Sequence, residues 1–100
     1  MIHHIVLVKF RADVTASERD GIWADLAALK HALPGLLSSK FGPNISPEGL
    51  ARGYSHAFVM TFEDAAARDA YLVHPDHKKA GARLVAAAKG GVDGICVVDI

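Results

Sequence analysis

The sequence has a single cysteine, no excess of either charge and no long hydrophobic run, and each absence excludes a class of protein. Cys96 has no second cysteine for an internal disulfide, and its apolar neighbours predict a buried, inert thiol. Eleven basic and eleven acidic residues balance, which argues against binding to nucleic acid or an anionic membrane. No apolar run approaches the roughly 18 residues of a membrane span, and Met1–His4 begins a strand pattern rather than a charged signal peptide. We therefore expect a cytoplasmic protein with no nucleic-acid or membrane partner.

Two familiar functional motifs are also missing. No Gly-x-Ser-x-Gly elbow for serine catalysis is present, and the stretch 42–52, although rich in glycine and proline, lacks a phosphate-binding pattern. That stretch is expected to be a surface loop, and long loops in small domains are often functional. A length of 100 residues, about half of them apolar, predicts one domain spanning residues 1–100 with a single modest core.

The sequence does contain a regular order of strands and helices. Runs rich in β-branched and large apolar residues predict strands at 2–10, 36–41, 53–62 and 92–100. One helix is expected after the capping pair Thr15 and Glu18, Asp64 caps a second helix over 65–72, and a third runs from Pro75 to about Lys89. This order predicts an α+β fold: a ferredoxin-like β-α-β-β-α-β protomer with a four-stranded antiparallel sheet and the helices on one face.

The period of two in the strands places two histidines among core residues and leaves one sheet face uncovered. His4 shares a face of its strand with Val6 and Val8, and His56 shares a face with Phe58 and Met60. The opposite face would expose an apolar patch larger than monomers usually leave in water, formed by Ile5, Leu7, Ala57 and Val59. We predict a homodimer in which two such faces pack about a two-fold axis. The alternative is a monomer with one exposed apolar face.

The stretch Asp69–Lys79 concentrates the side chains with catalytic potential. Pro75 fixes φ and lacks an N–H, so the helix is expected to break near His74 and to restart at Pro75. His77 would then lie in the first turn of the new helix, where the positive end of the dipole favours a neutral imidazole. Tyr71 would lie in the last turn of the preceding helix. The phenol and the imidazole are expected to face one cavity, unless both simply pack and hydrogen-bond.

A pocket between the sheet and the helices is expected to be lined by four polar side chains, His4, His56, Tyr71 and His77. A few polar groups in an apolar enclosure are typical of small-molecule sites. The alternative is that His4 and His56 are core residues bonded to backbone carbonyls. Three histidines are also enough for a zinc site, but their spacing matches no compact metal motif, and no acidic residue is evidently placed beside them. We therefore expect no metal, and we expect His3 and His31 at the surface.

Several separated stretches resemble the stress-responsive dimeric α/β-barrel (Dabb) family, and together they span almost the whole chain. They are residues 3–10 (His-His-Ile-Val-Leu-Val-Lys-Phe), 46–57 (from Ser-Pro-Glu-Gly to Tyr-Ser-His-Ala), 71–77 (Tyr-Leu-Val-His-Pro-Asp-His) and 97–99 (Val-Val-Asp). The resemblance implies a ferredoxin-like protomer and a sheet-to-sheet dimer, which together form a dimeric α+β barrel.

The resemblance also has implications for function. Most members of the family have no assigned reaction and are linked in plants to stress responses. One plant branch, of the olivetolic acid cyclase type, closes a linear polyketide by an intramolecular aldol condensation without any cofactor. Its catalytic tyrosine and the second histidine of its His-Pro-x-His segment match Tyr71 and His77 here, and its pocket histidines match His4 and His56.

The first helix departs from that plant branch, whose aromatic pocket residues are replaced here by Ile22, Trp23 and Leu26. The shape of the ligand therefore does not follow from the resemblance. The catalytic candidates are Tyr71 and His77, and the substrate-binding candidates are His4, His56, His74, Trp23 and Leu26.

The working hypothesis is a cofactor-independent enzyme, such as an aldol-type cyclase or another lyase or isomerase, that acts next to a carbonyl. His77 would take a proton from carbon, and Tyr71 would donate a hydrogen bond to the enolate oxygen. The alternative is a non-catalytic dimer that binds a small hydrophobic or aromatic ligand or serves in a stress response. A monooxygenase is a third possibility, by analogy of fold alone.

Overall fold

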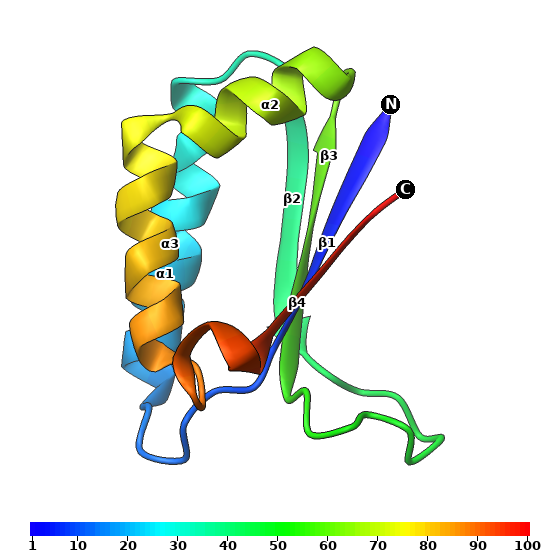
Figure 1. Ribbon diagram of the computed structural model, residues 1–100, viewed down its shortest axis with the longest axis vertical. Coiled ribbons are helices and arrows are strands. Elements are labelled where there is room, and N and C mark those ends of the chain that lie inside the picture. The colour runs from blue at the N-terminus through cyan, green and yellow to red at the C-terminus, as the bar shows by residue number, and fades with distance from the viewer.

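The computed structural model, which describes residues 1–100, has two layers: an antiparallel sheet and a layer of helices on one of its faces (Figure 1). The strands lie in the order β2-β3-β1-β4 and comprise β1 (Ile2–Val8), β2 (Leu36–Pro43), β3 (His56–Phe62) and β4 (Ile95–Asp99). The helices are α1 (Ala16–Ala27), α2 (Ala65–Val73) and α3 (Pro75–Ala87), with 3₁₀ turns η1 (Ala28–His31) and η2 (Gly91–Gly94). This arrangement confirms the predicted ferredoxin-like α+β fold.

Each helix begins at a residue whose side chain caps it. The Glu18 N–H donates to Thr15 Oγ1 at 3.1 Å at the start of α1, as the capping pair predicted. At the start of α2, the Ala67 N–H donates to Asp64 Oδ1 at 2.8 Å. These bonds satisfy N–H groups that have no partner inside the helix.

The break between α2 and α3 lies where proline predicted it. His74 has extended backbone angles (φ −67°, ψ 133°), and Pro75 is the first residue of α3. The Asp76 N–H donates to His74 Nδ1 at 3.1 Å, so the histidine side chain caps the new helix. Tyr71 is therefore in the last turn of α2 and His77 in the first turn of α3.

Two strands begin later than predicted because glycines turn the chain before them. Strand β3 begins at His56 rather than at Gly53, whose φ of 86° is in the left-handed region. Strand β4 begins at Ile95 rather than at Val92, because Gly91–Gly94 forms the turn η2.

The core lies between the sheet and the helices. From His4 onwards along β1, and from Phe58 onwards along β3, every second residue is buried, as the period of two predicted. These side chains pack against Ile22 and Leu26 of α1 and Leu29 of η1. His4, which is 5% exposed, is the only buried polar residue among them. A buried imidazole needs partners for its nitrogens.

An ion pair joins helices α1 and α3 next to Gly21 of α1. Arg83 Nη1 of α3 donates to Asp25 Oδ2 of α1 at 2.8 Å. A Cβ at Gly21 would lie 2.6 Å from Arg83 Nη2. The glycine, which weakens a helix by about 1 kcal/mol relative to alanine, makes room for the guanidinium.

The other face of the sheet has no helix over it (Figure 1). Ile5, Leu7, Ala57 and Val59 lie on this open face, as predicted, and each is partly buried in the single chain. Cys96 is opposite Leu7 on the same face and is also only partly buried. The predicted burial of this thiol is therefore wrong for the single chain, because β4 is an edge strand.

No helix in the structure combines the length and the apolar character that crossing a membrane requires.

Candidate active site

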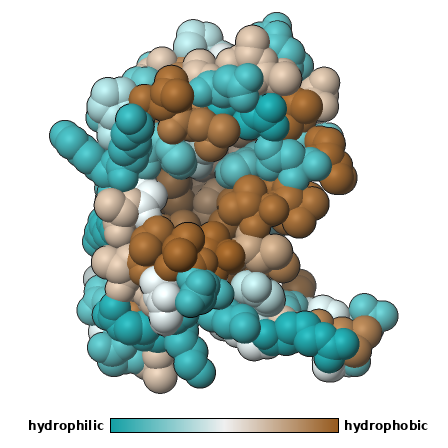
Figure 2. All heavy atoms as spheres, in the orientation of Figure 1, coloured by the Kyte–Doolittle hydropathy of each residue, from teal (hydrophilic) through white to brown (hydrophobic).

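A cavity of about 480 Å³ lies on the helix-facing side of the sheet, with walls from α1, α2, α3, η2 and three strands. Most of its wall is apolar, since 11 of its 15 lining residues are hydrophobic. Its polar groups belong to His4, His77, Lys78 and Tyr71, the last of which is counted among the hydrophobic residues for its ring. Figure 2 shows a hollow between the helices and the sheet, flanked by hydrophobic side chains. An apolar enclosure with a few polar groups is suited to a small molecule that is largely hydrophobic.

Tyr71 presents a polar atom that nothing in the protein satisfies. Its side chain is fully buried, and its hydroxyl has no hydrogen-bond partner. Burial raises the pKa of this phenol well above its ordinary value, so the hydroxyl keeps its proton and can donate. Buried hydroxyls are usually hydrogen-bonded. At Tyr71 the protein itself supplies no acceptor for this donor.

His77 lies beside Tyr71, with the two ring centroids 4.1 Å apart. Its Nδ1 is 3.3 Å from the backbone carbonyl oxygen of Leu72. Because a carbonyl only accepts, Nδ1 carries the proton and the neutral ring has its lone pair on Nε2. Burial lowers the pKa of His77, the bond to Leu72 opposes that effect, and the nearby His4 and His74 lower the pKa further. The ring is therefore neutral at pH 7 and can accept a proton.

Gly81 leaves space next to the free nitrogen of His77. It follows His77 by one turn of α3 and lines the cavity. A Cβ on Gly81 would lie 3.9 Å from His77 Nε2, with no other neighbour within 4 Å. A molecule in the cavity can therefore reach His77 Nε2 from the side of Gly81.

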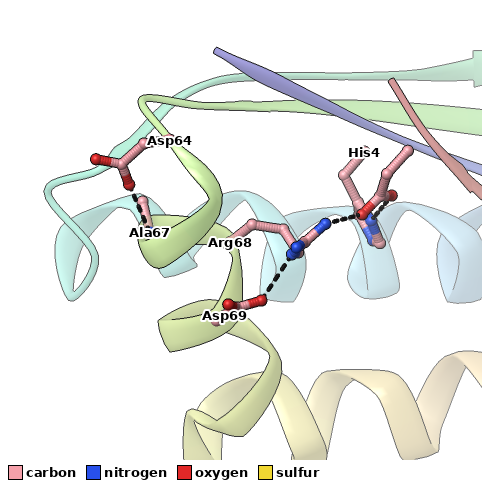
Figure 3. Close-up of polar contacts among 6 residues, drawn as sticks. His4, Asp64, Ala67, Arg68 and Asp69 are labelled. Atoms are coloured by element: carbon pink, nitrogen blue, oxygen red, sulfur yellow. Dashed lines mark hydrogen bonds and ion pairs between the residues drawn. The ribbon is translucent and has the colours of Figure 1, made fainter.

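His4 is held by a carboxylate, and that carboxylate is held in turn by an arginine (Figure 3). His4 Nδ1 is 2.7 Å from Asp99 Oδ1, and Arg68 Nη1 donates to Asp99 Oδ2 at 2.6 Å. Arg68 Nε also donates to Asp69 Oδ1 at 2.8 Å. Burial alone would raise the pKa of Asp99, but the hydrogen bonds from His4 and Arg68 outweigh it and hold the pKa below its usual range.

The expectation that no acidic residue lies beside the histidines is therefore wrong. Asp99 belongs to the last strand, and the β1–β4 register places it opposite His4. The signal in the sequence was an acidic residue at the end of an otherwise apolar strand. Arg68, the Leu72 carbonyl and Gly81 were also missed, because nothing in their local sequence marks them.

His56 does not line this cavity, contrary to the prediction. In the β1–β3 register it lies opposite Val8, whereas Met60 lies opposite His4. Four residues along a strand span about 13 Å. His56 lies instead beside the loop after β2, with Nδ1 2.9 Å from Ser55 Oγ and its ring 5.0 Å from that of Phe10.

The remaining substrate-binding candidates divide between the cavity and other places. Leu26 lines the cavity. Trp23 does not, because it packs in an aromatic cluster with ring centroids 5.1 Å from Phe41 and 5.7 Å from Phe58. His74 caps α3 and is not among the lining residues.

The histidines do not combine with other residues into a metal site. No group of three or more His, Cys, Asp or Glu side chains is placed to hold a metal ion. The chemistry available to the cavity from its own side chains is proton transfer and hydrogen bonding.

The chain is similar to a protein family and to several known proteins. The family model described as the stress responsive A/B barrel domain matches residues 2–100. Olivetolic acid cyclase from Cannabis sativa is 22% identical over 76% of this chain and 75% of the relative. A stress-response A/B barrel domain-containing protein from Arabidopsis thaliana is 32% identical over 96% of this chain and 81% of the relative.

A solved structure is also closely similar. A dimeric ferredoxin-like protein of unknown function from a Jannaschia species has a TM-score of 0.92 and 39% identity, and the match covers 99% of this chain and 96% of that one.

Proposed function

Because the chain belongs to the stress responsive A/B barrel domain family, we propose that it is a cofactor-independent enzyme that moves protons next to a carbonyl group. Its substrate is a small carbonyl or polyketide-like compound, and its reaction is that of an aldol-type cyclase or isomerase. One observation carries the proposal: the unpaired Tyr71 hydroxyl and the neutral His77 ring meet in an apolar cavity.

The proposed reaction begins with His77. Its Nε2 takes a proton from the carbon next to a carbonyl, and the electron pair of the C–H bond moves to the carbonyl oxygen. The Tyr71 hydroxyl donates a hydrogen bond to that enolate oxygen. Such a donor stabilises the negative charge that develops on the enolate oxygen, and a positioned general base contributes about 10²- to 10⁴-fold in rate.

Ring closure follows if the ligand carries a second carbonyl within reach. The enolate carbon attacks the second carbonyl carbon and forms the new C–C bond. The resulting alkoxide takes the proton from the His77 imidazolium, which restores the neutral base. Olivetolic acid cyclase is among the relatives, and this supports a cyclase over other reactions at a carbonyl.

We also propose that the protein is a homodimer through the open face of the sheet. A monomer that leaves this apolar face in water is unfavourable. The solved Jannaschia relative, which is 39% identical, is described as dimeric and ferredoxin-like. The cavity lies on the other side of the sheet, so each protomer has its own site.

A second candidate function is the binding of a hydrophobic ligand without turnover. The largely apolar wall of the cavity favours it. The two candidates share the cavity and differ in whether His77 takes a proton.

The test measures the exchange of protons next to a carbonyl for deuterium. Medium-chain methyl ketones and linear poly-β-ketone thioesters are incubated with the protein in D₂O, and exchange or ring closure is followed by ¹H NMR. We expect exchange by the unchanged protein and a loss of about 10²- to 10⁴-fold in His77→Ala. His31→Ala, which alters an exposed histidine, is the control and should exchange at the original rate.

The dependence on pH is part of the same test. Burial lowers the pKa of His77 below its ordinary value, which is about 6.5, so the base stays neutral until the solution is more acidic than that. The rate should be level near neutrality and should fall only below about pH 6.5. Exchange at the original rate in His77→Ala rules out the proposed base. Ketone binding without exchange by the unchanged protein favours the binding function.

A further inference from the structure

His4 has the same arrangement of nitrogens as His77, although it comes from a different element. An ionised carboxylate only accepts hydrogen bonds, so His4 Nδ1, 2.7 Å from Asp99 Oδ1, carries a proton. In the neutral ring the lone pair is then on Nε2. That nitrogen has no protein partner, and His4 lines the cavity. When its ring is neutral, His4 is therefore a second imidazole of the cavity with a proton-accepting nitrogen that no protein group binds.

The contacts of Asp99 fix its position and its charge. Arg68 Nη1 binds Oδ2 at 2.6 Å while His4 binds Oδ1 at 2.7 Å, so each oxygen has its own donor. The bond from Arg68 Nε to Asp69 at 2.8 Å orients the guanidinium in turn (Figure 3). A planar guanidinium held at two of its nitrogens can move little. Asp99 is thus a fixed anion rather than a mobile surface side chain.

His4 and His77 both border the phenol whose hydroxyl is unpaired. The Tyr71 ring centroid is 5.6 Å from that of His4 and 4.1 Å from that of His77. A carbonyl compound that accepts the Tyr71 hydrogen bond therefore lies within the neighbourhood of both imidazoles. The two rings differ in their support, because a carbonyl oxygen holds His77 whereas a carboxylate holds His4.

We propose that His4 is a second proton acceptor of the cavity and that Asp99, held by Arg68, is the positioning residue that fixes its tautomer. The role of His4 in proton transfer rests on the proposed function, whereas the positioning of its tautomer by Asp99 does not. His4 Nε2 takes a proton from carbon, the electron pair moves to the adjacent carbonyl oxygen, and the Asp99 carboxylate stabilises the imidazolium. In an aldol closure this serves the loss of water: His4 removes the second proton from the bond-forming carbon, and the hydroxyl leaves with that proton as water.

The first test reads the tautomer directly, with no substrate. Long-range ¹H–¹⁵N NMR spectra of the ¹⁵N-labelled protein, recorded above neutral pH, show which nitrogen of each histidine is protonated. We expect His4 to be protonated at Nδ1 and bare at Nε2, and we expect Asp99→Ala to shift the proton to Nε2, the usual site in free histidine. Asp25→Ala removes the carboxylate of the Arg83 pair and should leave His4 unchanged.

Each outcome of the NMR experiment decides the positioning claim. A neutral His4 ring in the unchanged protein with its proton on Nε2 and none on Nδ1 overturns it, and this result does not depend on the folding of any variant. An unchanged His4 spectrum in folded Asp99→Ala also overturns it. The expected shift in Asp99→Ala, together with an unchanged spectrum in Asp25→Ala, supports it.

The second test measures ring closure with loss of water in the poly-β-ketone thioesters named above, followed by ¹H NMR. We expect Asp99→Ala to lower kcat by about 10- to 100-fold with KM little changed, whereas Asp25→Ala keeps the original kcat. Full kcat in Asp99→Ala overturns the role of His4 in proton transfer while leaving the role of His77 intact. If the unchanged protein has the expected tautomer but exchanges no ketone proton, the proposed function and the proton-transfer role of His4 both fail, and the positioning by Asp99 stands.

Discussion

The Tyr71 hydroxyl places the stability of the protein in conflict with its proposed chemistry. A buried donor without a partner costs about 1–3 kcal/mol, and no protein group bonds this hydroxyl. We therefore predict that Tyr71→Phe, which keeps the buried ring, raises the free energy of unfolding by about 1 kcal/mol. The same change should slow ketone exchange by about 10²- to 10³-fold, as expected for the loss of one donor to an enolate oxygen.

Urea unfolding and the deuterium exchange assay measure the two effects separately. Tyr54→Phe is the matched control, because Tyr54 is partly exposed beneath Lys9 and does not line the cavity. It should change neither quantity appreciably. A clear loss of stability in Tyr71→Phe would show that the hydroxyl bonds to the protein, and the argument for a ligand would then fail.

The residues of the site differ in how far the sequence could predict them. Tyr71 and His77 are six positions apart on either side of a proline, so local rules for helices brought them together. His4 and Asp99 are 95 positions apart and meet only through the register of β1 with β4. The sequence indicates that strand pairs exist, but a shift of one residue in register would move Asp99 to the open face. The partner of His4 therefore could not be predicted.

At the scale of elements, the break between α2 and α3 places the polar groups at the end of α2 next to those at the start of α3. Helix termini leave backbone groups without internal partners. Here the His74 side chain accepts from the Asp76 N–H of α3, and the Leu72 carbonyl near the end of α2 meets His77 Nδ1. One helix end thus sets the tautomer of the base on the next helix. Proline and the caps made the break predictable, whereas the bond to Leu72 depends on the angle between the helices.

Substitution should have different effects at the two glycines inside helices, Gly21 of α1 and Gly81 of α3, because the space around them differs. A Cβ at Gly21 meets Arg83 at 2.6 Å, whereas a Cβ at Gly81 meets only His77 Nε2 at 3.9 Å. We predict that Gly81→Ala raises the free energy of unfolding by about 0.5–1 kcal/mol, because alanine loses less entropy in a helix. Gly81→Leu should fill the space beside His77 and abolish binding of the ketones.

Thermal unfolding and ligand-observed NMR with the same ketones measure these outcomes. Lys79→Leu places the same side chain on an exposed position of α3 outside the cavity, and it should leave binding unchanged. Undiminished ketone binding by Gly81→Leu would place the ligand elsewhere in the molecule.

At the scale of the whole molecule, the sheet separates two surfaces with different roles. Because side chains alternate along β1, His4 and Val6 lie on the cavity side of the sheet, whereas Ile5 and Leu7 lie on the open face. The period of two in the sequence predicted both surfaces. The position and extent of the cavity could not be predicted, because they depend on how far α3 and η2 stand from the edge strand β4. His56 shows the same limit, since it shares the face of His4 but lies too far along the strand.

The separation of the two surfaces makes the proposed dimer testable without disturbing the site. Val59 lies at the centre of the open face, opposite Ile5 on β1 and Lys40 on β2. A glutamate there would remain hydrated in a monomer but would become a buried, unpaired charge between two sheets, which is strongly unfavourable. We therefore predict a mass of twice the 10.6 kDa chain for the unchanged protein and a single-chain mass for Val59→Glu, measured by light scattering after gel filtration.

The control for this change is Val73→Glu, at a residue of α2 that is 69% exposed, and it should remain dimeric. Because no residue of the cavity wall lies on the open face, monomeric Val59→Glu should still bind ketones while it is folded. A Val59→Glu protein that stays dimeric would show that the protomers meet through another surface, and the open apolar face would then need a different occupant.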